Sequence, residues 1–274
     1  MISARTPLYG IVGNPVRQSL SPVIHNLTFR RMGWDAVYLA FEVDDLYAAI
    51  SGIRGLGIKG LSVTIPFKTE VIPFLDEVEG MAKKIKAVNT IVNEGGKLIG
   101  YNTDSYGAIK ALEERVDLKG EKVLLLGAGG AARAIGYGLK ERGSEIVISN
   151  RSSDRGKKLA EELGCPFKPL ASLEGVDADI LINATSAGMH PNAGESPLRK
   201  EFLKAGMIVM DIVYRPRRTQ LLREAEKCGC QVIDGLEMLA YQGAKQLEIW
   251  TGRKPDVVKI KEDLHRMEER VNRD

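Results

Sequence analysis

The sequence predicts an α/β protein with mainly parallel strand pairing, and three observations support this fold class. Strand-like and helix-like segments alternate between Leu8 and Ile65. Strand and helix alternate again from Lys122 to Ile233, the pattern of a doubly wound sheet. Two helical segments then follow without another strand. The 274 residues suffice for two modest domains. A polar connection from Asp117 to Glu121 places the expected domain boundary near Asp104 to Glu121.

The composition is that of an ordinary globular protein, with 44% hydrophobic and 27% charged residues. The net charge of +3, spread over 39 basic and 36 acidic residues, predicts no nucleic-acid-binding stripe and suits an anionic small substrate. The three cysteines lack the spacing of a disulfide framework or a zinc site. No stretch has the apolar length of a signal peptide or a membrane span. We therefore expect a cytoplasmic protein without a metal or a membrane partner.

Three strands and two helices are predicted at the start of the chain. Ser21, followed by proline, would cap a helix that ends near Met32. Asp44 would cap a second helix, whose apolar residues recur at helical spacing. Ser19 and Ser21 also suit a polyhydroxylated or carboxylate ligand, although capping by itself explains Ser21 and leaves only Ser19 free. The three strands are Leu8 to Gly13, Ala36 to Val43 and Lys59 to Ile65.

Polar residues follow the third strand, at the edge where ligands of open α/β sheets bind. They include Thr64 and Lys68. A lysine here is either a solvated surface charge or a functional group, and its position beyond a strand end favours function. Downstream, a glycine turn predicts a hairpin, with Asn89 early in its first strand. The expected elements are a helix from Glu79 to Lys86, hairpin strands Ala87 to Asn93 and Lys97 to Asn102, and a helix from Ser105 to Arg115, capped by Thr103 or Asp104.

The glycine-rich turn after Leu126 has the spacing G-x-G-x-x-A, formed by Gly127, Gly129 and Ala132. Gly127 permits a tight turn, Gly129 lets the backbone approach a pyrophosphate, and Ala132 lets helix and strand pack closely. The helix that follows offers free N–H groups and a positive dipole end to phosphates. Because a strand and a helix flank the turn correctly, it predicts a dinucleotide site. A glycine-rich turn without a ligand is the alternative.

The next strand end predicts which dinucleotide binds. Proteins that bind NAD usually place an acidic residue there, on the ribose 2′-hydroxyl. This chain has Asn150, Arg151 and Ser152, with Arg155 close behind. A carboxylate would repel a 2′-phosphate, whereas arginine can bind it through two hydrogen bonds. We interpret Asp154 as a helix cap, and the sequence therefore favours NADP over NAD.

The remaining segments complete the second sheet and the helical tail. Such a tail often packs on another domain. The expected strands are Glu145 to Ser149, Asp179 to Ala184, Met207 to Tyr214 and Gln231 to Ile233, and the expected helices are Ala131 to Arg142, Asp154 to Leu163, Pro197 to Ala205, Thr219 to Cys228, Leu236 to Gly252 and Pro255 to Val271.

Nine short motifs, in this order, closely resemble those of the shikimate dehydrogenase family, and together they run over nearly the whole chain. They are Ser19-Leu-Ser-Pro22, Thr64-Ile-Pro-Phe-Lys68, Ala87-Val-Asn-Thr90, Gly100-Tyr-Asn-Thr-Asp104, Gly127-Ala-Gly-Gly-Ala131, Asn150-Arg151, Asn183-Ala-Thr-Ser-Ala-Gly-Met189, Val213-Tyr-Arg-Pro216 and Gly235-Leu-Glu-Met-Leu-Ala-Tyr-Gln242. The resemblance implies an NADPH-dependent, reversible reduction of 3-dehydroshikimate to shikimate, in aromatic amino-acid and chorismate biosynthesis. It also implies a substrate-binding and catalytic domain of residues 1–104 and 237–274, and a Rossmann-type NADP-binding domain of residues 105–236.

The resemblance also implies roles for individual residues. Lys68 and Asp104 would form the catalytic pair. The substrate's carboxylate and hydroxyls would be contacted by Ser19, Ser21, Thr64, Asn89, Tyr214 and Gln242, together with the pair. NADP would be contacted by Gly127, Ala128, Gly129, Gly130, Ala131, Asn150, Arg151, Ser152, Arg155, Ala184, Thr185, Ser186, Ile212, Gly235 and Met238.

Two other functions are also compatible with the sequence. One is a quinate/shikimate dehydrogenase that prefers NAD, against which Arg151 and the paired serines weigh. The other is a non-catalytic protein that senses a nucleotide or metabolite on the same scaffold, which would be expected to lack Lys68 or Asp104. For the quaternary structure we expect a monomer or a homodimer.

Overall fold

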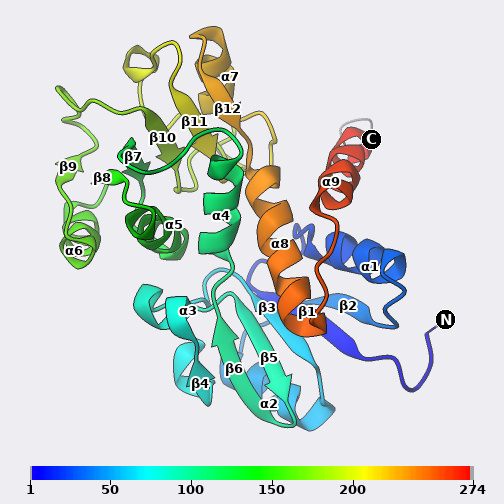
Figure 1. Cartoon of the computed structure of the whole chain (residues 1–274). Helices are drawn as coiled ribbons and strands as arrows, with labels where there is room; N and C mark the ends of the chain where they lie inside the picture. The colour runs from blue at the N-terminus through cyan, green and yellow to red at the C-terminus, as the bar shows by residue number, and fades with distance from the viewer. Residues whose placement is uncertain (1, 272–274) are drawn as a thin grey trace. The chain divides into compact units, whose positions relative to one another are not determined.

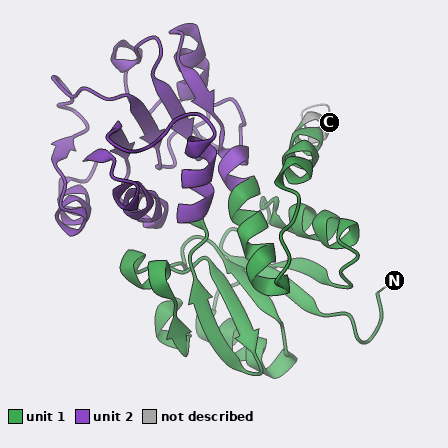
Figure 2. Ribbon diagram, in the orientation of Figure 1, with its two compact units in different colours: residues 1–104, 240–274 green, residues 105–239 purple. Residues whose placement is uncertain are grey.

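The computed structural model describes residues 2–271 and divides into two compact units (Figures 1 and 2). Unit 1 comprises Met1–Asp104 and Ala240–Asp274, and unit 2 comprises Ser105–Leu239. The sequence between the two parts of unit 1 therefore folds as a separate body. None of the helices within residues 2–271 combines the length and the apolar character that a membrane span requires.

Unit 1 contains a six-stranded sheet in the order β2-β1-β3-β5-β6-β4. The pairs β1–β2, β1–β3 and β4–β6 are parallel, whereas β3–β5 and β5–β6 are antiparallel. Gly95 and Gly96 both have positive φ and form the turn of the predicted hairpin, which the β5–β6 pairing confirms. The strands are β1 (Leu8–Gly13), β2 (Val37–Glu42), β3 (Gly60–Val63), β4 (Glu77–Val78), β5 (Thr90–Glu94) and β6 (Lys97–Tyr101).

The helices of unit 1 enclose an apolar core against this sheet. Leu46, Ile50 and Ile53 recur at helical spacing on α2 and are buried against Val12 and Leu61, as their pattern predicted. The elements are α1 (Ser21–Arg31), α2 (Leu46–Leu56), the 3₁₀ turn η1 (Ile72–Phe74), α3 (Gly80–Ile85), the second part of α8 (Gly235–Thr251) and α9 (Val257–Val271).

Two predicted helix caps in unit 1 are wrong. Leu20 occupies the cap position of α1, and Ser21 is already helical and makes no capping bond. The cap of α2 is Asp45, whose extended backbone lets its carboxylate accept from the Ala48 N–H at 2.9 Å. Asp44 instead accepts from the Asn14 side chain at 2.9 Å. The hydroxyl of Ser21 is therefore not committed to capping.

Unit 2 contains a second six-stranded sheet, in the order β12-β11-β10-β7-β8-β9, in which every neighbouring pair is parallel. The chain order reverses between β7 and β10, which places a topological switch point beside the glycine-rich turn. The doubly wound fold is thereby confirmed. The strands are β7 (Lys122–Leu126), β8 (Glu145–Asn150), β9 (Phe167–Pro169), β10 (Ile180–Asn183), β11 (Ile208–Asp211) and β12 (Gln231–Ile233).

Two local predictions in unit 2 are also wrong. The helix expected from Pro197 is only the 3₁₀ turn η2 (Lys200–Phe202), because the segment is extended at Arg199 and again at Leu203. Asp154 does not cap α6; Ser152 occupies the cap position, and Asp154 lies in the first turn, where it favours the helix dipole. The helices are α4 (Asp104–Glu113), α5 (Gly130–Glu141), α6 (Ser153–Leu163), α7 (Gln220–Lys227) and the first part of α8.

Candidate active site and nucleotide site

Lys68 lies in a turn beyond β3 and reaches Asp104 at the start of α4. The backbone of this turn is fixed by two hydrogen bonds: Phe67 N–H donates to Thr64 at 2.9 Å, and Val88 N–H donates to the Lys68 carbonyl at 2.7 Å. The ammonium of Lys68 donates to Asp104 Oδ2 at 2.6 Å. The two side chains are only 19% and 7% exposed, so Lys68 is not a solvated surface charge.

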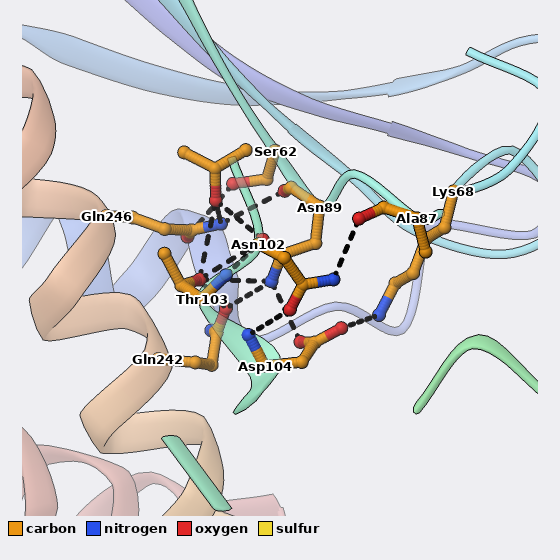
Figure 3. A network of polar contacts seen from close by, with 10 residues as sticks. Ser62, Lys68, Ala87, Asn89, Asn102, Thr103, Asp104, Gln242 and Gln246 are labelled. Atoms are coloured by element: carbon orange, nitrogen blue, oxygen red, sulfur yellow. Dashed lines mark hydrogen bonds and ion pairs between the residues drawn. The ribbon is translucent and has the colours of Figure 1, made fainter. Parts of the chain in front are cut away.

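The side chain of Asn89 hydrogen-bonds the other oxygen of the Asp104 carboxylate. Its amide nitrogen donates to Asp104 Oδ1 at 2.8 Å and to Thr103 Oγ1 at 3.0 Å, while its amide oxygen accepts from the Thr103 N–H at 2.8 Å (Figure 3). The backbone N–H of Thr103 can only donate, so the orientation of the Asn89 amide is fixed by chemistry. Each oxygen of Asp104 thus has its own donor, and the carboxylate is held toward Lys68.

Gln242 joins this group from α8. Its amide oxygen lies 3.4 Å from Thr103 Oγ1 and 3.5 Å from the Asn89 amide nitrogen, at the outer limit of a hydrogen bond. Four of the predicted substrate and catalytic residues are therefore brought together in unit 1. They are Lys68, Asn89, Asp104 and Gln242.

The other predicted substrate residues come from three further segments of the chain. Ser19 and Ser21 stand at the start of α1, where Ser19 Oγ accepts from the Ser21 N–H at 3.2 Å. Thr64 is half-buried directly after β3. Tyr214 lies in unit 2, in the loop after β11. Its role remains a prediction.

Sequence reasoning missed a buried polar layer behind this group. Gln246 is 1% exposed and accepts from Ser62 Oγ and from His25 Nε2, both at 3.1 Å. Tyr38 donates to Ser62 at 2.6 Å, and its burial raises its pKa. Burial lowers the pKa of His25 to about 3, so this histidine is neutral at physiological pH. Two glutamines at i, i+4 spacing on a buried helix are the one signal that could have indicated this layer.

In unit 2, the glycine-rich turn has the geometry that an anion site requires. Gly127 has a φ of +120°, and a Cβ there would lie 2.7 Å from the Ala184 carbonyl oxygen, so only glycine fits. Gly129 caps α5, and a Cβ on it would meet nothing within 4 Å. No side chain caps α5 and no acidic residue lies in its first turn, which leaves N–H groups for phosphate oxygens.

A cavity of about 500 Å³ opens beside this turn. Among its lining residues are eight that the sequence predicted to contact the cofactor: Gly127, Ala128, Gly129, Asn150, Arg151, Ala184, Thr185 and Ser186. Seven predicted residues do not line it: Gly130, Ala131, Ser152, Arg155, Ile212, Gly235 and Met238. The lining also includes residues that sequence reasoning missed, among them Leu170, Asn192, Glu195 and Ser196.

The end of β8 suits a phosphate. Asn150 donates to the Ser152 carbonyl at 2.9 Å, and the side chains of Arg151 and Arg155 are exposed. Among the side chains that the structure describes, neither arginine has a hydrogen-bond or ion-pair partner. The guanidinium groups can therefore bind a 2′-phosphate without breaking existing contacts. Together with the uncapped helix and the open space at Gly129, these residues fit NADP.

A buried carboxylate holds the strand ends that border the cavity. Asp211 accepts from Asn183 Nδ2 and the Val213 N–H, both at 3.0 Å, and from Thr219 Oγ1 at 2.7 Å. Asn183 in turn accepts from the hydroxyl of Thr185, a cavity residue, at 2.7 Å. Burial raises the pKa of Asp211 to about 6, against the opposing effect of these hydrogen bonds.

Close packing also explains one predicted glycine outside the cavity. A Cβ on Gly235 would lie 2.5 Å from the carbonyl oxygen of Ile212, so these two backbones touch at the start of α8. In the described part of the chain, no three His, Cys, Asp or Glu residues are grouped as they would be around a metal ion.

Comparison with known proteins identifies the family. The chain matches the substrate-binding domain of shikimate dehydrogenase over residues 11–91, shikimate/quinate 5-dehydrogenase over residues 109–238, and the shikimate 5′-dehydrogenase C-terminal domain over residues 235–264. It is 52% identical over 252 residues to the shikimate dehydrogenase (NADP⁺) of Pyrococcus abyssi, which covers 91% of this chain and 94% of that protein. The chain belongs to the shikimate dehydrogenase family.

Solved structures of the shikimate dehydrogenase family support the same assignment. A shikimate dehydrogenase in complex with NADP⁺ is 43% identical, with a TM-score of 0.92 over 97% of each chain. The Thermus thermophilus enzyme, in complex with NADP(H) and shikimate, is 37% identical, with a TM-score of 0.89 over 95% of this chain and 99% of that chain. The predicted family and the predicted fold class are both confirmed.

Proposed function

We propose that this protein is an NADP-dependent shikimate dehydrogenase, which reversibly reduces 3-dehydroshikimate to shikimate on the route to chorismate and the aromatic amino acids. The observation that carries the proposal is the Lys68–Asp104 pair, with its 2.6 Å hydrogen bond. The pair is mostly buried, in a chain whose relatives are named for this reaction. A non-catalytic sensor would have no use for such a pair.

Lys68 is the proton donor in this mechanism. The nicotinamide of NADPH, when bound, supplies a hydride to the carbonyl carbon of the substrate. The ammonium of Lys68 holds the carbonyl oxygen by a charge-assisted hydrogen bond and delivers a proton as negative charge develops there. Asp104 keeps the ammonium in place and hydrogen-bonds the hydroxyl that forms. Positioned acid–base groups of this kind contribute roughly 10²–10⁴ in rate.

The substrate is recognised by neutral hydroxyls and amides that surround this pair. The amides of Asn89 and Gln242 lie beside Asp104 and suit the ring hydroxyls. Hydroxyl donors suit the carboxylate, because each O–H can hydrogen-bond an anion while leaving the site uncharged. The residues assigned to the substrate are Ser19, Ser21, Thr64, Lys68, Asn89, Asp104, Tyr214 and Gln242. Residues 1–104 and 237–274 accordingly form the substrate-binding and catalytic domain.

Residues 105–236 form the NADP-binding domain in this proposal. The pyrophosphate is bound by the turn from Gly127 to Ala131 at the start of α5, and the 2′-phosphate by Asn150, Arg151, Ser152 and Arg155. The nicotinamide end is contacted by Ala184, Thr185, Ser186, Ile212, Gly235 and Met238. We further propose that the enzyme acts in the cytoplasm as a monomer or homodimer, without nucleic-acid or membrane partners; light scattering measures the oligomeric state.

One set of assays tests the function. Oxidation of NADPH and of NADH is followed spectrophotometrically with 3-dehydroshikimate, and reduction of NAD⁺ and NADP⁺ with quinate and with shikimate. We expect kcat/KM to be highest for NADPH with 3-dehydroshikimate. A preference for NAD⁺ with quinate would support the quinate/shikimate alternative. Tight binding of shikimate without turnover of any of these compounds would support the sensor alternative.

A further inference from the structure

Gln246 begins a directed series of hydrogen bonds that ends at the Lys68–Asp104 pair. Its amide nitrogen donates to the Asn89 backbone carbonyl at 3.2 Å and to Thr90 Oγ1 at 2.9 Å. Because a backbone carbonyl can only accept, the first contact fixes which end of the Gln246 amide faces Asn89. The oxygen of Thr90 must therefore act as the acceptor toward Gln246.

The hydroxyl of Thr90 in turn fixes which end of the Asn89 amide faces it. Since Thr90 Oγ1 accepts from Gln246, its single proton is available to Asn89 Oδ1, 2.8 Å away. The same oxygen accepts from the Thr103 N–H, so two donors hold it. The nitrogen of the Asn89 amide is left to face Asp104, to which it donates at 2.8 Å (Figure 3).

We propose that Thr90 and Gln246 are positioning residues for the reaction, which hold the Asn89 amide in the orientation that keeps Asp104 against Lys68. The inference rests on the proposed function, because it assigns roles within the same site. Without the Thr90 hydroxyl, the Thr103 N–H would be the remaining backbone donor to Asn89 Oδ1, so the amide would be held less firmly in the orientation that faces Asp104. Asp104 would then lose one of its two donors and the fixed direction of its contact with Lys68.

The test uses two substitutions of Thr90, one that removes the hydroxyl and one that keeps it. Thr90→Val keeps the shape of the side chain but removes the hydroxyl, so the Gln246 N–H and the Asn89 oxygen each lose a partner. We expect kcat for shikimate oxidation to fall about tenfold, the equivalent of one buried hydrogen bond. The KM for shikimate should change less than about twofold. Thr90→Ser keeps the hydroxyl, so its kcat should stay near the wild-type value.

Thr28 supplies the matched control. It is 2% exposed on α1, and its hydroxyl has no hydrogen-bond partner among the described residues. Thr28→Val makes the same chemical change at an equally buried site, outside the series. It should leave kcat unchanged. Equal losses in Thr28→Val and Thr90→Val, or equal losses in Thr90→Val and Thr90→Ser, would overturn the inference.

A second measurement does not depend on turnover. Exchange of the Asn89 side-chain amide protons with solvent, followed by NMR, should be slow in the wild type and in Thr90→Ser, and faster in Thr90→Val. Unchanged exchange in Thr90→Val would overturn the positioning role even if the wild type is active. A wild type inactive on 3-dehydroshikimate that still shows this pattern would overturn the proposed function and leave the Asn89 orientation established.

Discussion

Each unit buries a polar network beside its candidate site, and the two networks are built from opposite kinds of group. In unit 1, buried neutral groups such as His25 and Gln246 support an ion pair that is partly exposed. In unit 2, the carboxylate of Asp211 is fully buried and is held by three uncharged donors. Unit 1 thus keeps its charges at the proposed catalytic pair, whereas unit 2 places a charge in the network that holds its strand ends.

Acid should therefore affect the two units in opposite directions. Burial depresses the pKa of His25, because a charged imidazolium is costly to bury. Protonation of His25 therefore favours the unfolded state, in which the ring is exposed to water. Burial raises the pKa of Asp211, so protonation removes a charge that is costly to bury. Low pH therefore destabilises the network around His25 and stabilises the network around Asp211.

The largest expected effect belongs to Lys68. Lys68→Ala removes the group proposed to hold the carbonyl oxygen and supply the proton, so kcat should fall by roughly 10²–10⁴ while the KM for shikimate changes little. Steady-state kinetics in both directions measure both parameters. Lys83→Ala removes an exposed lysine of α3 as a control and should leave the kinetics unchanged. Near-normal turnover of Lys68→Ala would contradict the catalytic assignment.

The next largest effect is the acid response of unit 1. The pKa of His25 is about 3 in the folded protein against 6.5 ordinarily, so its contribution is full above pH 6.5 and is lost as the pH falls toward 3. The loss is on the order of 5 kcal/mol over that interval. Both tryptophans, Trp34 and Trp250, lie in unit 1, so urea unfolding followed by fluorescence measures this unit.

The matched variant for this prediction is His25→Gln, which can still donate to Gln246 but does not titrate. Its free energy of unfolding should fall less steeply than that of the wild type between pH 6.5 and pH 4. The other titratable ring packed against His25 is that of Tyr38, which burial keeps neutral throughout this range. Parallel curves for the two proteins would show that His25 does not cause the acid response.

The contribution of Asp211 to the stability of unit 2 should change with pH in the opposite direction. Its pKa is raised from 3.8 to about 6, so its contribution is full below pH 3.8 and is lost as the pH rises through 6. Relative to Asp211→Asn, the wild type should therefore gain about 3 kcal/mol when the pH falls from 7 to 4. Hydrogen exchange of backbone amides in β10 and β11 measures this unit separately. A wild type that loses stability relative to the variant on acidification would refute the predicted sign.

How far the sequence predicts each site depends on the range of the interactions involved. The glycine-rich turn was predictable because its strand, turn and helix are contiguous, and the positive φ of Gly127 is required by the turn itself. The strand β9 was not predicted, because it has three residues and ends in Pro169 at the sheet edge, where a missing N–H costs nothing. Asp44 and Asp45 are indistinguishable by spacing, and only the backbone decides which one caps α2.

Side-chain networks are harder to predict, because their members come from distant segments. Lys68 and Asp104 are 36 residues apart, and nothing in their spacing shows that they touch; the family resemblance supplied that pair. Gln246 escaped prediction entirely, because its four partners come from α1, β3 and the start of β5. A buried glutamine looks like any other polar helix residue until the strands beneath it are placed.

The smallest effect should separate binding in unit 2 from chemistry in unit 1. Arg151 lines the nucleotide cavity with an exposed guanidinium, and a charge-assisted hydrogen bond to a phosphate is worth roughly 1.5–3 kcal/mol. Arg151→Ala should therefore raise the KM for NADPH about 10- to 100-fold and leave kcat and the KM for NADH nearly unchanged. Arg199→Ala, at an exposed arginine of the same unit outside the cavity, is the control. An equal rise in KM for NADH would mean that Arg151 does not contact the 2′-phosphate, and NADP selectivity would then have to come from Arg155.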